Sequence, residues 1–187
     1  MKFISYFFIP HTNNLLYLFM VSLFLFGCSG SDGGNKEIQT TITKYNLSIS
    51  STSDANINSI GDPAPLKINI FNLSSENEFM NSDFFTLHYN PNNVLGKNLS
   101  SSKQVYLLPG SEPIEVVGQV TEEYPYIGIS GEFQNLNNRN WRTIFSIKPI
   151  EKIPFYKFWL TSSSQKKINV VVDSQGIYIV EDNDSKK

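Results

Sequence analysis

The chain has 187 residues, of which 40% are hydrophobic and 17% charged, and its formal net charge at pH 7 is −2. Because the lysines and arginines are few and scattered, the sequence predicts no basic face for nucleic acid. The single cysteine excludes a disulfide within the chain, and no motif predicts a cofactor.

Residues 1–27 have the parts of a secretory signal: a basic Lys2, an apolar run beginning at Leu15, and the small residue Gly27. An apolar run that ends in a small residue and then a cysteine resembles the lipobox of bacterial lipoproteins, although Phe26 is bulky for this motif. We therefore expect cleavage between Gly27 and Cys28, with Cys28 as the lipid-bearing first residue. The alternative is an uncleaved anchor, but the uninterrupted run is shorter than the roughly 20 residues that span a bilayer.

Cleavage at this point would leave 160 residues (187 − 27), which is enough for one domain with its own core. Residues 28–40 are rich in Ser, Gly, Asn and Asp and are predicted to form a flexible tether. Residues 41–180 are the predicted folded domain, and residues 181–187 are a polar tail.

The predicted domain begins with a strand after Thr41, in which Leu47 and Ile49 alternate with polar residues. A polar loop, residues 51–65, separates it from a second strand. In that strand, Leu66–Phe71, apolar and mostly polar residues alternate, which predicts a half-buried strand.

The hydrophobic period then changes from that of a strand to that of a helix. Ser75 and Glu78 have the spacing of a capping box, which marks a helix start. Apolar side chains follow at helical spacing, and Pro91 cannot continue a helix. We therefore expect one short helix before Pro91, followed by a turn.

Alternation returns in the second half of the domain, where turn signals separate the strands. The predicted strands are residues 104–108, a strand with Ile114, Val116, Gly118 and Val120 on one face, residues 126–133, a strand with Trp141, Thr143, Phe145 and Ile147 on one face, and a hairpin of residues 168–172 and 176–180. The glycines of residues 126–133 predict bulges or close packing against a neighbouring layer. Seven or eight short strands without crossover helices predict an all-β, antiparallel β-sandwich with one short helical insertion.

Few residues could carry catalysis. His88 is the only histidine of the predicted mature chain, and no serine lies in a nucleophile-elbow motif. A zinc site draws on several His or Cys ligands, so no metal site is predicted. An envelope hydrolase would require a cleft that joins His88 to acidic residues, and we predict no enzyme.

The aromatic residues leave a binding function open. A lipoprotein for a small ligand, peptide or glycan would require an apolar cavity lined by Trp141 or Trp159, whereas core packing would fill that space. The run Phe155–Leu160 is apolar on both sides, which predicts either cover on both faces or a contact surface.

An ordered series of motifs resembles the TssJ family, the outer-membrane lipoproteins of type VI secretion systems. In chain order, the series consists of residues 65–73, Phe79, residues 83–87, residues 95–99, the Pro109-Gly110 turn, residues 126–133 and the Trp-Arg pair at residues 141–142. The resemblance covers roughly residues 28–149, and the segment from Ile150 onward has no clear counterpart.

The resemblance implies a transthyretin-like β-sandwich, anchored through acylated Cys28 in the inner leaflet of the outer membrane. It also implies a partner, the periplasmic C-terminal part of the inner-membrane protein TssM. In this family the loop after the first strand contributes to that contact, and it corresponds here to residues 53–64. The partner-binding residues implied are Asn56, Ile57, Asn58, Ile60 and Asp62. The two isoleucines either contact the partner or tuck back onto the sandwich.

Overall fold

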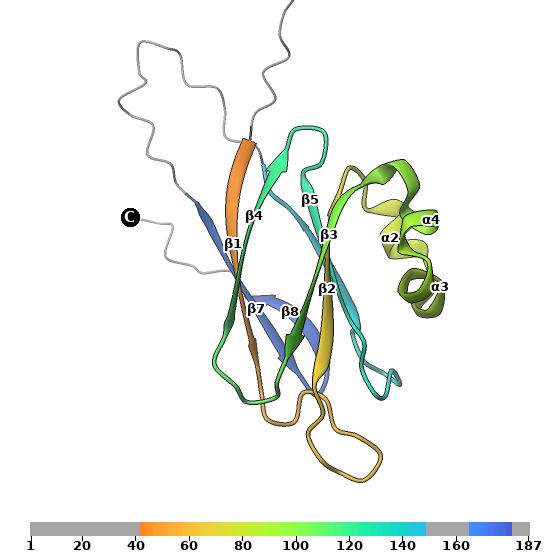
Figure 1. The fold of residues 1–187 in the computed structure, drawn as a ribbon, viewed down its shortest axis with the longest axis vertical. Coiled ribbons are helices and arrows are strands. Elements are labelled where there is room, and N and C mark those ends of the chain that lie inside the picture. The colour runs from red at the N-terminus through yellow and green to blue at the C-terminus, as the bar shows by residue number, and fades with distance from the viewer. Residues whose placement is uncertain (1–41, 149–164, 181–187) are drawn as a thin grey trace, which may run out of the picture. The chain divides into compact units, whose positions relative to one another are not determined.

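A computed structural model describes residues 42–148 and 165–180, which form two four-stranded sheets (Figure 1). The predicted signal, tether, polar tail and the run 155–160 lie outside these residues. The first sheet has the order β4-β1-β7-β8, with β1 Ile42–Ser51, β4 Ile114–Thr121, β7 Lys166–Asp173 and β8 Gly176–Val180. The second sheet has the order β3-β2-β5-β6, with β2 Leu66–Leu73, β3 Leu99–Leu107, β5 Tyr126–Gly131 and β6 Arg142–Ser146. The predicted two-layer β-sandwich is confirmed.

One strand pair departs from the antiparallel rule. β1 pairs antiparallel with β4 but parallel with β7, so that Leu47 lies opposite Val116 on one side and Ile168 on the other. The remaining pairs between the named strands are antiparallel. β1 is therefore a central strand, held on both edges by segments that are distant in the sequence.

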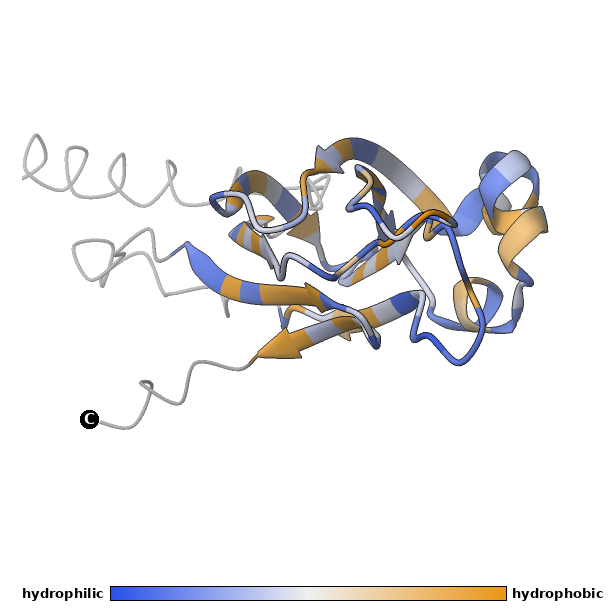
Figure 2. Ribbon diagram, turned by 90° about the horizontal axis from the view of Figure 1, so that it is seen from below, coloured by the Kyte–Doolittle hydropathy of each residue, from blue (hydrophilic) through white to orange (hydrophobic). Residues whose placement is uncertain are grey.

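Hydrophobic and hydrophilic residues alternate along several strands (Figure 2), and the hydrophobic side chains of both sheets form the main core cluster. Leu47, Ile49 and Val170 from the first sheet meet Ile68 and Ile129 from the second, and all five side chains are fully buried. Burying each such side chain contributes about 1.5–3 kcal/mol. The alternation in the sequence therefore determines which side chains of each strand face the core.

β2 is buried on both faces, so the prediction of a half-buried strand was wrong. Leu66, Ile68 and Ile70 pack in the core between the sheets. Phe71 and Leu73, which point the other way, pack against helices in a second cluster. The outer face is covered because the helical insertion between β2 and β3 lies over it (Figure 1).

The insertion contains three short helices and a 3-10 turn rather than the single helix expected. Its elements are α2 Asn77–Asn81, α3 Phe84–Tyr89, α4 Pro91–Leu95 and η1 Gly96–Asn98. The predicted capping box was also wrong. The Ser75 hydroxyl accepts from the N–H of Asn77 at 3.2 Å, and α2 has no side-chain cap. Pro91 occupies the start of α4, where its missing N–H costs nothing.

Each helix contributes one buried side chain to the second cluster: Phe79, Leu87 and Leu95. The Phe79 ring lies directly over Gly128 of β5, where an added Cβ would stand 3.0 Å from the ring. This contact confirms the close packing predicted from the glycines of β5.

Candidate functional site

Four connections gather at one end of the sandwich, at the bottom of Figure 1. They are the β1–β2 loop (52–65), the β3–β4 loop (108–113), the β5–β6 loop (132–141) and the β7–β8 turn (174–175), which together we name the loop end. Ile42, where β1 begins, lies at the opposite end (Figure 1).

Asn56 fixes the β1–β2 loop against the β5–β6 loop. Its side chain is fully buried, and its Nδ2 donates to the carbonyls of Ala64 and Pro65 at 3.2 and 3.1 Å. Its Oδ1 accepts from the backbone N–H of Gln134 at 2.9 Å. Asn56 therefore shapes the loop from within, and its side chain presents no surface to a partner.

Asn58 organises the tip of the same loop. Its Oδ1 accepts from the backbone N–H groups of Ile60 at 3.0 Å and of Asp62 at 2.9 Å. Gly61 completes the turn with a φ of 94°, which glycine adopts without strain. The Ile60 side chain is 80% exposed, so this isoleucine projects into solvent instead of tucking back onto the sandwich.

The remaining residues of the implied contact differ in exposure. Ile57 is partly buried and forms a bridge across the loop, whereas Asp62 is exposed. A second anchor comes from Arg139, whose Nη1 donates to the carbonyl of Ala55 at 2.7 Å. The loop is thus held at its base by two residues, Asn56 and Arg139, and presents Ile60 at its tip.

Leu108 is an exposed residue of the loop end that was not predicted to lie at the site. Its side chain is 55% exposed, and its carbonyl accepts from the Ser51 hydroxyl at 3.0 Å and the Ser111 N–H at 3.1 Å. The predicted strand included Leu108, but β3 ends at Leu107. The Pro-Gly turn that follows was the available signal. Ile60 and Leu108 give the loop end two exposed aliphatic side chains.

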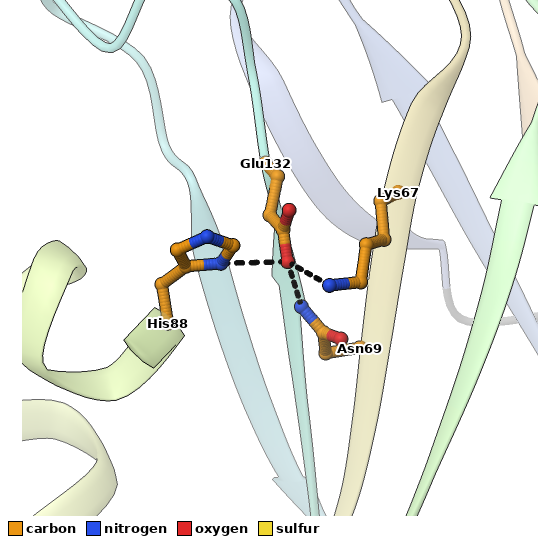
Figure 3. Close-up of polar contacts among 4 residues, drawn as sticks. All are labelled: Lys67, Asn69, His88 and Glu132. Atoms are coloured by element: carbon orange, nitrogen blue, oxygen red, sulfur yellow. Dashed lines mark hydrogen bonds and ion pairs between the residues drawn. The ribbon is translucent and has the colours of Figure 1, made fainter. Parts of the chain in front are cut away.

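His88 does meet an acidic residue, as the hydrolase alternative required. Its Nδ1 lies 2.8 Å from Oε1 of Glu132, which also contacts Lys67 Nζ at 2.8 Å and Asn69 Nδ2 at 2.9 Å (Figure 3). Nδ1 of His88 makes no hydrogen bond, so its contact with Glu132 is an ion pair only when the imidazole is protonated. The imidazole ring stacks on Phe84, with 5.8 Å between ring centroids.

The environment keeps the Glu132 carboxylate charged. Burial is the largest influence and by itself raises the pKa of this carboxyl. Lys67, Asn69 and His88 together outweigh it and hold the pKa below its ordinary value. Since the carboxylate is already contacted by three partners from β2 and α3, we interpret the cluster as a support that holds α3 on the sheet.

Trp141, the predicted cavity-lining residue, packs between the two core clusters. Its ring meets Phe84 edge-on at 5.2 Å, and the Arg142 guanidinium lies 4.4 Å from the ring centroid. Trp159, the alternative cavity-lining residue, lies outside the described residues. Among the residues described, no group of three His, Cys, Asp or Glu side chains could hold a metal ion. In the ranges 42–148 and 165–180, no helix is both long and apolar enough to cross a membrane.

Several solved structures share this fold. Lip from Serratia marcescens, described as a membrane-bound component of the type VI secretion system, is 32% identical with a TM-score of 0.68, over 74% of this chain and 98% of Lip. The lipoprotein TssJ1 from Pseudomonas aeruginosa is 20% identical with a TM-score of 0.63, over 74% of this chain and 95% of TssJ1. A chain in the structure described as the TssM C-terminal domain (869–1107) from EAEC is 17% identical with a TM-score of 0.55, over 74% of this chain and 98% of that one.

The family model for type VI secretion lipoproteins, which bear the names SciN, VasD, EvfM and TssJ, matches residues 43–175. The chain belongs to this family, and the resemblance to TssJ is confirmed. It is therefore a type VI secretion lipoprotein, a component of the secretion membrane complex. A comparison with curated protein sequences found no match.

Proposed function

We propose that a lipid on Cys28 anchors this domain in the inner leaflet of the outer membrane, while the loop end binds the periplasmic C-terminal part of TssM. Membership of the family supports this function. The shared fold with a chain in the TssM structure supports the choice of partner. Such a chain would connect TssM to the outer membrane.

The observation that carries the proposal is the position of the β1–β2 loop. This hydrogen-bonded loop, which exposes Ile60 at its tip, lies at the opposite end of β1 from Ile42. β1 has ten residues, so it spans about 30 Å at roughly 3.3 Å per residue. A membrane anchor on the Ile42 side would leave the loop end facing away from the bilayer. That arrangement suits a partner that reaches across from the inner membrane.

The loop is suited to binding because it is ordered in advance. Asn56, Asn58 and Arg139 fix its backbone, so little conformational entropy would be lost when a partner docks. Ile60 then supplies apolar surface, and full burial of such a side chain contributes about 1.5–3 kcal/mol.

The replacement Ile60→Asp is expected to weaken binding to the periplasmic part of TssM by at least about tenfold, because a carboxylate would replace the apolar tip. Binding is measured by calorimetry with residues 28–187 carrying Cys28→Ser, which separates association from anchoring. The stability of the domain should not change, since the Ile60 side chain is exposed.

The matched control is Ile42→Asp, which changes another exposed isoleucine, at the opposite end of β1. It should bind TssM like the parent chain. Undiminished binding by Ile60→Asp would remove the loop tip from the interface, and no association of the parent chain would refute the partner.

The replacement Cys28→Ser is expected to abolish incorporation of radiolabelled palmitate and to move the protein from the membrane fraction to the soluble periplasmic fraction. One acyl chain gives marginal attachment and two or more give stable anchoring. The replacement Ser29→Ala, at the neighbouring position, should keep the label. Labelling that persists in Cys28→Ser would show that the lipid is attached elsewhere.

A further inference from the structure

The sandwich has an open seam between β3 and β4. β3 pairs only with β2, and β4 pairs only with β1, among the strands described. A cavity of about 210 Å³ lies in this seam and is lined by residues of β1, β2, β3 and β4. Its size suits one or two side chains, and it is separate from the loop end.

Fixed polar groups form the floor of the seam. The Tyr45 hydroxyl donates to Oδ1 of Asn72 at 3.2 Å, and Nδ2 of Asn72 donates to the carbonyl of Gln119 at 3.1 Å. Gly118 makes room for the tyrosine, because an added Cβ would stand 2.3 Å from its hydroxyl oxygen. The cavity is therefore shaped by contacts between the two sheets.

Lys103 gives the seam a positive charge. The register places Lys103 opposite Ile70 of β2, whose side chain packs in the core between the sheets, so Lys103 is on the inward face of an edge strand. No carboxylate lines the cavity. Among the described residues, Lys103 makes no ion pair.

An inward-facing lysine on an edge strand discourages the addition of unrelated strands. The same charge favours a strand that brings a carboxylate to it, so a single residue can both reject and select. β3 is nine residues long and exposed over most of its length, which leaves a row of backbone donors and acceptors for a further strand.

We propose that the β3 edge accepts an extended, acidic segment of a partner protein by strand addition, with one carboxylate side chain entering the seam to pair with Lys103. The backbone of β3 supplies the hydrogen bonds, and the seam supplies specificity for the side chain. This surface would act in addition to the loop end, and it does not depend on the proposed TssM contact.

The test uses residues 28–187 with Cys28→Ser and three seven-residue peptides of alternating Thr and Val, with Glu, Gln or Lys at the centre. Binding is followed by amide NMR shifts, by hydrogen exchange and by titration. The Glu peptide should bind at least about fivefold more tightly than the Lys peptide and should protect amides of β3.

The variant Lys103→Glu should reverse the preference, so that the Lys peptide binds best. Lys148→Glu, which changes an exposed lysine just after the opposite edge strand β6, should leave it unchanged. Equal binding of the three peptides, no binding, shifts confined to the loop end, or an unchanged preference in Lys103→Glu would each overturn the proposal. Because Lys103 and Lys148 are both exposed, Lys103→Glu and Lys148→Glu should both fold, and thermal unfolding checks this.

Discussion

Replacing Phe79 with alanine is expected to lower the free energy of unfolding by about 3–5 kcal/mol. The Phe79 side chain is fully buried, its ring lies 5.7 Å from that of Phe71, and it closes over Gly128. The backbone of α2 is tied to the sheet through Arg142, whose Nη1 donates to the Phe79 carbonyl at 2.7 Å. Urea unfolding followed by circular dichroism measures the loss.

This cost should be large because the helices cannot stand alone. α2 has five residues and α3 has six, which is far below the length at which an isolated helix is stable in water. Met80→Ala, at the neighbouring and partly exposed position, should cost less than about 1 kcal/mol. If Phe79→Ala cost as little as Met80→Ala, the insertion would add little to the stability of the domain.

Asn56→Ala is expected to lower the free energy of unfolding by about 2–3 kcal/mol and to weaken TssM binding as well. The truncation removes three hydrogen bonds and leaves a cavity at the base of the β1–β2 loop. Urea unfolding gives the stability, and hydrogen exchange of the amides of residues 56–64 gives the order of the loop.

Asn58→Ala provides the comparison, since Asn58 supports only the tip of the loop. It should cost about 1 kcal/mol and raise exchange near Ile60 alone. If Asn56→Ala left exchange across the loop at the parent rate, the loop would be held by other contacts, chiefly that of Arg139 with Ala55.

The strands were predictable because their information is local. Leu47 and Ile49 alternate with polar neighbours, and the side chains that the pattern assigned to the core are buried. The closing hairpin was equally clear, since two apolar runs flank a short polar turn, and β7 and β8 pair as expected.

The parallel pairing of β1 with β7 was not predictable from the sequence, because no turn joins the two strands. The prediction of a single helix in the insertion was wrong for a related reason. Ser75 and Pro91 carry signals that fit more than one local geometry, and packing of Phe79 against β5 decides between them.

The loop end shows the same division between local and distant information. The polar composition of residues 53–64 predicts a loop, but the burial of Asn56 depends on Gln134, which is 78 positions away. The contact of His88 with Glu132 likewise joins two elements, α3 and the β5–β6 loop, that no sequence pattern relates. The assignments of Gly27 and Cys28 stay predictions.

The central position of β1 has a mechanical consequence. A force between a lipid at Cys28 and a partner at the loop end would load β1 along its length. β1 is paired at eight positions with β4 and at seven with β7, so both ladders would bear the load in shear and would have to break together. Resistance to forced unfolding is set by the unfolding rate. This rate should be low because both ladders must break in the same step. The strand order therefore suits a domain that is loaded along β1, as the proposed anchor and partner would require.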